Sequence, residues 1–308
     1  MSRYGAGFAT TSVFELSRPA LLPLRYYIAY YAAMIFKDKT VVITGGSEGV
    51  GAATARMFAD AGANLLLVAR GKKKLEAIAE ELRDKTRVEI FAMDVADAEA
   101  CRDLFKKALF EYGSVDILIN NAGHHVRAPF DSANADELAT TINVNLRAPI
   151  VLSRLAIPYM QEAEGGAIIN VGSLAGRTAV PGSVVYAASK AGLRSFTYSL
   201  AEEMFGGNIK IGLVSPGPID TGFIMDDIDA VTDLVFSQPL CTPEEVAQVV
   251  LDLCGNDVRE QCLHTSSRII TTLTYLWPWL GRQLRPMLEK KGAAMKVKLK
   301  AAQQTPAE

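Results

Sequence analysis

The chain has 308 residues, of which 49% are hydrophobic and 21% charged, so it can bury a sizeable core. Its formal net charge of −2 argues against a protein that binds nucleic acid through an overall basic surface. The chain has four scattered cysteines, so we expect a cytoplasmic protein with reduced thiols: Cys101, Cys241, Cys254 and Cys262. We expect no metal site, because these cysteines have no metal-ligand spacing and the chain has only three histidines.

The N-terminal segment 1–37 is apolar and rich in tyrosine. Its uninterrupted apolar run, 26–36, has 11 residues, whereas a membrane-spanning helix needs about 20. The run leads directly into Lys37 without the small-residue cleavage site of a signal peptide. We therefore expect an extension that either contacts a membrane surface or packs on protein.

From residue 40 onward, short β-branched runs alternate with longer helical patterns. We predict strands at 40–44, 64–69, 87–94, 115–123, 166–173 and 209–217, and helices at 50–61, 72–83, 97–112, 135–162, 184–204 and 242–254. Apolar strands that alternate with helices predict a parallel sheet covered on both faces. The predicted fold class is therefore α/β, a doubly wound parallel sheet, in one domain over 38–265 with an appendage at each end.

A glycine-rich loop, TGGSEGVG at 44–51, follows the first predicted strand and leads into a helix. Gly45, Gly49 and Gly51 permit a tight turn and a close approach of the backbone to a pyrophosphate, with Ser47 and Val50 beside them. Strand, loop and helix in this order predict a dinucleotide site. The alternative is a glycine-rich turn that holds no ligand.

The end of the second predicted strand indicates which dinucleotide is bound. An NAD enzyme carries an acid there for the ribose 2′-hydroxyl, but this chain has Arg70, followed by the lysines 72–74. A guanidinium at that position suits a 2′-phosphate, so we predict NADP(H). Glu48 complicates this prediction, because its carboxylate lies within the same loop.

The stretch VVYAASKAG at 184–192 places Tyr186 and Lys190 one helical turn apart. A free phenol titrates at about 10, and a fixed cation on the same helix face favours the phenolate and lowers that pKa. A pKa closer to the working pH is what general acid–base catalysis requires. Taken alone, the pair could equally be a coincidence on a solvated helix.

These motifs, with NNAG at 120–123, Ser173 after the fifth strand and PG at 216–217, form an ordered set that resembles the short-chain dehydrogenases/reductases over about 40–255. The resemblance implies a Rossmann fold in which Tyr186 is the general acid during reduction and the base in oxidation. Lys190 would also reach the nicotinamide ribose, Ser173 would polarise the substrate oxygen, and Asn145 would hold a water that links the lysine to solvent.

The same resemblance implies further cofactor contacts. Asp94 and Val95 would contact the adenine, and Asn121, Ala122 and Gly123 would pass along the adenosine ribose. The nicotinamide carboxamide would be held by Pro216, Gly217, Ile219 and Thr221.

The segments around the expected substrate site follow no family motif. The loop 222–240 combines apolar residues with four aspartates and occupies the place of a substrate lid, and His124 and His125 either border the pocket or face solvent. The C-terminal appendage 266–308 begins with an apolar, tryptophan-containing stretch and continues as a basic one. It either binds a membrane interface or packs on the protein. This layout is similar to that of 3-ketosphinganine reductases.

We therefore expect an NADPH-dependent carbonyl reductase or alcohol dehydrogenase that acts on a hydrophobic, lipid-like ketone or alcohol. The sequence does not determine the direction of the reaction. The resemblance also implies a homodimer or homotetramer, and peripheral membrane contact is a further expectation. The alternative from another class is a non-catalytic NADP-binding regulatory or scaffold protein, which would not need all four of the groups named for catalysis.

Overall fold

The computed structural model describes residues 35–304 of the chain. Most of the N-terminal extension, including almost all of the apolar run 26–36, lies outside the described residues.

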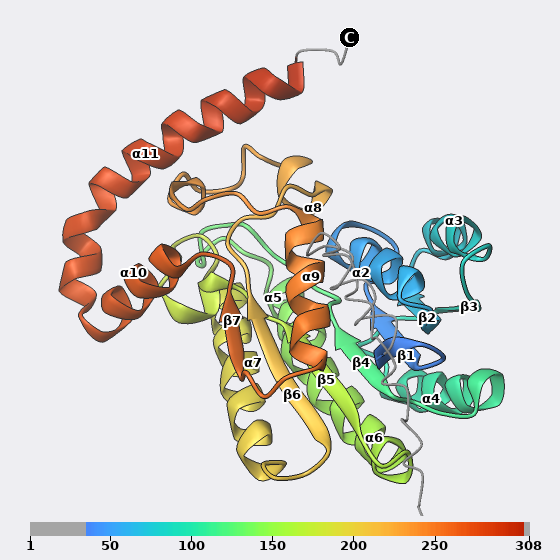
Figure 1. Cartoon of the computed structure of the whole chain (residues 1–308). Helices are drawn as coiled ribbons and strands as arrows, with labels where there is room; N and C mark the ends of the chain where they lie inside the picture. The colour runs from blue at the N-terminus through green and yellow to red at the C-terminus, as the bar shows by residue number, and fades with distance from the viewer. Residues whose placement is uncertain (1–34, 305–308) are drawn as a thin grey trace, which may run out of the picture.

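A seven-stranded parallel sheet forms the centre of the protein (Figure 1). The strands lie in the order β3-β2-β1-β4-β5-β6-β7, so the chain first builds outward from β1 and then crosses to the other side at β4. This reversal creates a crevice at the carboxyl ends of β1 and β4, where doubly wound sheets bind their ligands. The strands are β1 (Thr40–Thr44), β2 (Asn64–Ala69), β3 (Val88–Ala92), β4 (Ile117–Asn120), β5 (Gly166–Val171), β6 (Ile209–Ser215) and β7 (Glu260–Cys262).

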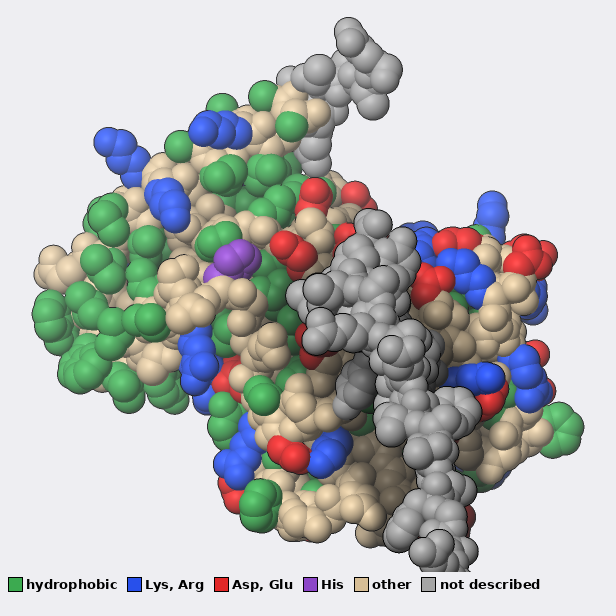
Figure 2. All heavy atoms as spheres, in the orientation of Figure 1, with side chains coloured by type: hydrophobic (Ala, Val, Ile, Leu, Met, Phe, Trp, Pro, Cys, Tyr) green, Lys and Arg blue, Asp and Glu red, His purple; other side chains and the backbone are tan. Residues whose placement is uncertain are grey.

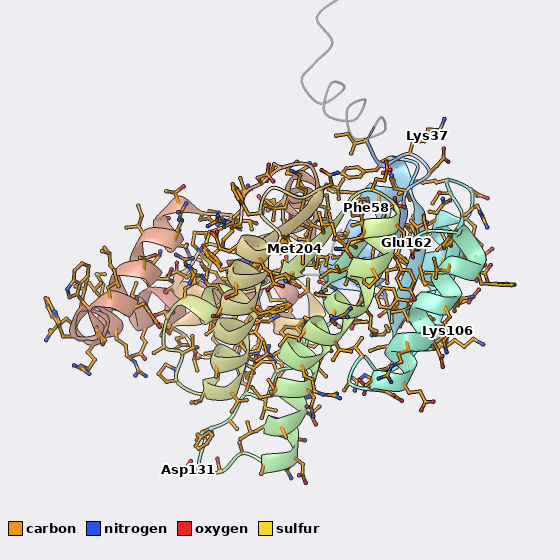
Figure 3. The ribbon with its side chains drawn as sticks, turned by 90° about the horizontal axis from the view of Figure 1, so that it is seen from below. Lys37, Phe58, Lys106, Asp131, Glu162 and Met204 are labelled. Carbon is orange, nitrogen blue, oxygen red and sulfur yellow. The ribbon has the colours of Figure 1, made fainter. Side chains whose placement is uncertain are left out.

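Helices cover both faces of the sheet, because the central strands are apolar on both sides. On β1, Val41 and Ile43 pack into the core under α2 (Gly49–Asp60), α3 (Lys72–Leu82) and α9 (Pro243–Cys254). Val42 packs into the core on the opposite face, under α4 (Ala98–Tyr112), α6 (Ala148–Glu162) and α7 (Val184–Glu203). Figure 3 shows Phe58 of α2 inside the fold and Lys106 of α4 projecting outward. The predicted α/β doubly wound fold is therefore confirmed.

Local signals explain where several helices begin and end. The Asp97 side chain accepts hydrogen bonds from the first amides of α4, which ends at Gly113 in the left-handed conformation. The predicted cap of α9 is present as a reciprocal pair between Thr242 and Glu245, with Pro243 in the first turn.

The single helix predicted over 135–162 is wrong in one respect. It is divided into α5 (Ala135–Ile142), a π-helical turn η1 (Asn143–Arg147) and α6. The π turn shifts the hydrogen-bond register by one residue, and the Ala148 amide donates to the Asn143 carbonyl five residues earlier. Asn145 lies in this turn.

The C-terminal appendage consists of two helices that pack partly on the domain. α10 (Thr265–Leu276) packs beside η2 (Leu174–Arg177), and α11 (Pro278–Gln304) packs against η3 (Val235–Ser237) of the loop 222–240, which also contains the short α8 (Gly222–Met225). Figure 1 shows α11 passing this loop and extending away from the sheet. Among the described residues, no helix combines the length and apolar character needed to cross a membrane.

Candidate active site

A continuous cleft of about 1080 Å³ opens at the carboxyl ends of the strands. One end is lined by the glycine loop and by residues that follow β2, β3 and β4, and the middle is lined by Ser173, Tyr186 and Lys190. The far end is lined by the loop 222–240, α10 and α11. The residues expected to hold a cofactor and those expected to react with a substrate therefore lie in one cleft.

The glycine loop has the conformation that its sequence requires. Gly45 and Gly49 have φ values of +66° and +53°, in the left-handed region that side chains disfavour. The Asn121 side chain donates to the carbonyls of Thr44 and Gly45, which ties the loop to the end of β4. Within residues 35–304, no side chain caps the first amides of α2, so these amides remain suited to an anion.

Gly51 has a role in packing beside the one predicted. It does not line the cleft, and a Cβ atom added to it would lie 2.0 Å from the carbonyl oxygen of Gly45. Its lack of a side chain therefore lets α2 pack closely against the loop, and its contact with a cofactor stays a prediction.

The charged residues near the end of β2 are arranged so that the carboxylate of Glu48 is neutralised. Lys74 donates to Glu48 at 2.5 Å, and this contact raises the pKa of Lys74. Arg70 lines the cleft together with both residues. The complication raised by Glu48 is thereby reduced, because the carboxylate has a cation of its own.

The three central groups come from two neighbouring elements. Ser173 precedes η2 and accepts a hydrogen bond from the Ala175 amide at 3.1 Å. Tyr186 and Lys190 lie in the first turns of α7, and the Lys190 ammonium is 5.8 Å from the Tyr186 ring centroid. Its Nζ donates to the Val171 carbonyl at 2.7 Å, which holds the lysine against the end of β5.

The predicted lowering of the Tyr186 pKa by Lys190 is wrong for this structure. Burial raises the pKa of Tyr186, while the hydrogen bond with Ser173 and the charge of Arg127 oppose the rise. Burial also lowers the pKa of Lys190 to about 8. The reason is that both groups are withdrawn from water, which disfavours the charged form of each.

Asn145 is fully buried and does not line the cleft. Its amide donates to the His124 carbonyl at 2.8 Å and to the Ser189 hydroxyl at 3.1 Å, and its oxygen accepts from the His124 amide at 2.8 Å. The side chain therefore fastens the segment after β4 to α7. The water link remains a prediction.

Two residues beside the NNAG motif enter the cleft next to Tyr186. The ring of His125 stacks on that of Tyr186 with centroids 3.9 Å apart, and its Nε2 lies 2.9 Å from the Ser183 hydroxyl. Burial lowers the pKa of His125 to about 3, so its imidazole is neutral. Arg127 lies over the Phe223 ring and donates to the Phe223 carbonyl. Both histidines line the cleft, but no motif in the sequence indicated Arg127.

Of the residues predicted to form the site, only Asn145 and Gly51 do not line the cleft. Those that do are Gly45, Ser47, Gly49, Val50, Arg70, Asp94, Val95, Asn121, Ala122, Gly123, Ser173, Tyr186, Lys190, Pro216, Gly217, Ile219 and Thr221.

The loop 222–240 places its apolar and acidic residues on different sides. Phe223, Ile224, Leu234 and Val235 line the cleft. Ile228, Val231 and Phe236 are buried in a small cluster against which Leu299 of α11 packs. None of the four aspartates of the loop lines the cleft.

Comparison with known proteins identifies the family. Residues 39–230 match the short chain dehydrogenase family. The chain is 33% identical over 229 residues to the 3-oxoacyl-[acyl-carrier-protein] reductase FabG of Thermotoga maritima, which spans 73% of this chain and 93% of the relative. It is 32% identical over 225 residues to the protein of the same name from Chlamydia muridarum. That match covers 71% of this chain and 91% of the relative. An uncharacterized oxidoreductase of Staphylococcus aureus is 31% identical over 217 residues, 70% of this chain and 91% of the relative. Together with the parallel sheet and its order of strands, these matches show that the chain belongs to the short-chain dehydrogenase family of oxidoreductases.

Proposed function

We propose that the protein is an NADPH-dependent reductase of hydrophobic ketones, able to run the reverse oxidation of the alcohol. The observation that carries the proposal is the convergence of Ser173, Tyr186 and Lys190 in the middle of one cleft, between an anion-compatible glycine loop and an apolar end. A binding protein without turnover would need the loop but not these three groups.

The residues at the nucleotide end fit a dinucleotide that carries a 2′-phosphate. The glycine loop offers uncapped helix amides for the pyrophosphate, and Arg70 would hold the 2′-phosphate after β2. Asp94 and Val95 would border the adenine, and residues 216–221 the nicotinamide. When bound, NADPH supplies the hydride that the substrate carbon receives.

The chain's own residues would handle the substrate oxygen. The Ser173 hydroxyl would donate to the carbonyl oxygen and polarise it, and Tyr186 would transfer its phenolic proton to that oxygen as the carbon gains the hydride. The raised pKa of Tyr186 keeps the phenol protonated at neutral pH, which suits reduction. The charged form of Lys190, 5.8 Å from the ring centroid, would then stabilise the phenolate until it is reprotonated.

The proposed substrate is lipid-like because the cleft wall on its side is apolar. The lid residues Phe223, Ile224, Leu234 and Val235 face this space, and Ile270 and Leu288 extend the wall into the C-terminal helices. Two of the relatives are named as reductases of 3-oxoacyl groups, in which the ketone is part of an acyl chain.

We further propose peripheral contact with a membrane through the junction of α10 and α11. Tyr275, Trp277 and Trp279 are 70%, 49% and 58% exposed there, and Figure 2 shows hydrophobic side chains gathered over this part of the molecule. Tryptophan and tyrosine beside a basic helix suit the bilayer interface. Flotation with lipid vesicles should be lost in the Trp277→Ser, Trp279→Ser double variant, and equal flotation of both proteins would exclude this contact.

Association of two or four copies is proposed from the family. The exposed Phe110 on α4 and Ile150 on α6 lie on helices through which we propose that copies pack. Light scattering of Phe110→Glu and Ile150→Glu variants, which should shift toward monomer, tests this surface.

The decisive experiment for the enzyme is NADPH oxidation with a panel of long-chain ketones. Tyr186→Phe removes the transferable proton and should lower kcat by at least about a hundredfold, within the usual range for general acid catalysis. Tyr159→Phe on α6, which packs on Phe105 and does not line the cleft, is the control and should keep full activity. Tight NADPH binding without turnover of any ketone would favour the non-catalytic alternative.

Cofactor choice is tested by calorimetry of the protein with NADPH and NADH. Arg70→Ala should weaken NADPH binding by about tenfold to a hundredfold, as expected for one charge-assisted hydrogen-bonded pair, and leave NADH binding nearly unchanged. Lys72→Ala, an exposed neighbour that does not line the cleft, is the control. Equal affinities for both cofactors in the unaltered protein would contradict the assignment to NADPH.

A further inference from the structure

The substrate end of the cleft has an unbalanced charge. Its charged lining residues beyond Lys190 are Arg127, Arg282 and Arg285, and among the described residues no carboxylate lines this end. The two acids in the lining, Glu48 and Asp94, lie at the nucleotide end, after β1 and β3. A ligand in the substrate end is therefore surrounded by apolar groups and positive charge.

Two of the four acids of the lid, Asp229 and Asp233, face α11, whereas Asp227 acts electrostatically on Arg127 and leaves Arg282 and Arg285 as the cations farther along the cleft. Asp229 pairs with Lys300, and Asp233 lies 3.6 Å from the Lys296 ammonium. Lys296 also donates to the Val231 carbonyl at 2.7 Å, so the acidic side of the lid is held against the later turns of the helix. The apolar side of the lid remains for the cleft.

Arg282 and Arg285 lie at the end of an apolar wall in the first turns of α11. Ile270, Tyr275 and Leu288 line the cleft beside them. The Nε of Arg285 donates to Glu289 at 2.7 Å, which leaves its two terminal nitrogens for a ligand in the cleft. For Arg282, the described part of the chain provides no hydrogen-bond or ion-pair partner. Both arginines lie beyond the segment 39–230 that matches the family, so the family match does not account for them.

We propose that Arg282 and Arg285 form an anion-binding subsite for the substrate. The ligand is a hydrophobic ketone, or the corresponding alcohol, with a carboxylate, phosphate or sulfate at the end remote from the carbonyl. Guanidinium groups bind such oxyanions through paired hydrogen bonds, and burial of the intervening hydrocarbon would position the ketone at Tyr186. The same charges disfavour an amine-bearing ketone such as a sphingoid base. This substrate class rests on the proposed reductase function.

The first test uses the full-length protein with NADPH and a series of keto fatty acids that differ in ketone position. Each acid is compared with its methyl ester, which keeps the chain and removes the charge. We expect the best acid to exceed its ester by about tenfold in kcat/KM, corresponding to about 1.4 kcal/mol. The preference should decrease as salt is added, because exposed charges are screened.

The second test assigns that preference to the two arginines. In the Arg282→Met, Arg285→Met double variant, acids and esters should be used about equally. Lys290→Met, an exposed cation on the same helix that does not line the cleft, should behave like the unaltered protein. Equal use of acids and esters by the unaltered protein would overturn the subsite. So would a preference that persists in the double variant.

A third measurement separates failure of the subsite from failure of the proposed function. Calorimetry with dodecanoate and dodecanol, neither of which contains a ketone, measures the subsite without turnover. Tighter binding of the acid that is lost in the double variant supports the subsite even if no ketone is reduced. If the double variant instead loses only its binding to phosphatidylglycerol vesicles, and its fatty acid binding is unchanged, the arginines bind lipid headgroups and the substrate assignment is overturned.

Discussion

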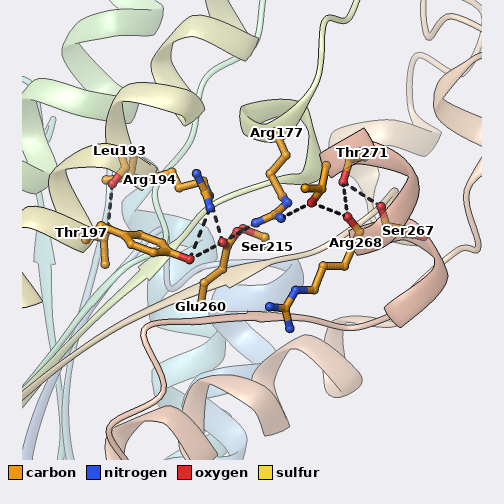
Figure 4. A network of polar contacts seen from close by, with 11 residues as sticks. Arg177, Leu193, Arg194, Thr197, Ser215, Glu260, Ser267, Arg268 and Thr271 are labelled. Carbon is orange, nitrogen blue, oxygen red and sulfur yellow. Dashed lines mark hydrogen bonds and ion pairs between the residues drawn. The ribbon is translucent and has the colours of Figure 1, made fainter. Parts of the chain in front are cut away.

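Glu260 provides the sharpest test of how the C-terminal part of the chain is joined to the catalytic region. Its carboxylate, 4% exposed, is shared by Arg177, Arg194, Tyr198 and Ser215 (Figure 4). Arg177 is itself 8% exposed and donates to Thr272 of α10 at 2.7 Å. Replacing Glu260 with methionine keeps a similar volume but leaves the Arg177 guanidinium buried without its anion.

The expected cost follows from the burial of the pair. Breaking a buried ion pair by removing one partner costs about 3–5 kcal/mol, a large share of a typical free energy of unfolding of about 5–15 kcal/mol. Urea unfolding of the Glu260→Met variant should show this loss. The control is Arg83→Met, which removes exposed pairs with Glu76 and Glu80 and should leave the free energy of unfolding nearly unchanged.

The same variant should also affect the reaction, because Arg177 ends the short helix η2 that Ser173 begins. We expect kcat to fall while NADPH affinity is kept. Removing both charges, in Glu260→Met with Arg177→Met, should restore part of the stability, since no unpaired charge is then buried. A cost below about 1 kcal/mol for Glu260→Met, or a double variant whose losses simply add, would refute this reasoning.

Two further predictions concern Lys190 and the lid. The pKa of Lys190 is about 8 in the folded protein and 10.5 for the free group. Between these two pH values the unfolded chain therefore binds more protons than the folded one. The free energy of unfolding should rise with pH across this window. Lys190→Met should lack that rise, and parallel pH curves for the two proteins would contradict it. Lys296, 15% exposed, donates hydrogen bonds to the lid carbonyls of Val231 and Asp229. Lys296→Met should raise the KM for ketone several-fold and speed amide hydrogen exchange over 226–237. Its affinity for NADPH should be unchanged. The exposed Lys298→Met is its control, and unchanged exchange in the lid would count against the contact.

The parts of the fold that the sequence predicts are those set by local patterns. Six strands and the order of elements follow from runs such as 40–44 and 64–69, which are apolar throughout because both faces of the sheet are covered. The edge strand β7 has only three residues, and Glu260 within it is polar because it serves the charge network rather than the core. The π turn at 143–147 shifts the hydrogen-bond register by one residue, and the periodicity of side chains in the sequence does not reveal such a shift.

The catalytic groups at the centre of the site can also be predicted from a local pattern. Tyr186 and Lys190 are one turn apart on one helix, and the glycine loop is contiguous, so spacing alone brings these groups together. The direction of the Tyr186 pKa shift differs from the prediction because it depends on burial in the folded protein, where the His125 ring stacks on the phenol, and spacing along a helix does not include burial. The packing role of Gly51 could not be predicted from spacing, since it depends on how closely the backbone of Gly45, six residues earlier, lies to an added Cβ atom.

The substrate end depends on contacts that no local pattern specifies. It is assembled from the segment after β4, the lid and the two C-terminal helices, and the lid meets α11 where Gly292 approaches Asp233 so closely that an added Cβ would lie 1.7 Å from its carbonyl oxygen. Only glycine permits that approach, so a side chain at residue 292 would force the lid and α11 apart. In the sequence, four aspartates among apolar residues gave the loop a mixed character. In the fold, Asp229 and Asp233 pair with lysines of α11, and the same helix contributes Arg282 and Arg285 to the lining of the cleft. Selectivity for the substrate is therefore expected to vary with α11 even when the catalytic groups are unchanged.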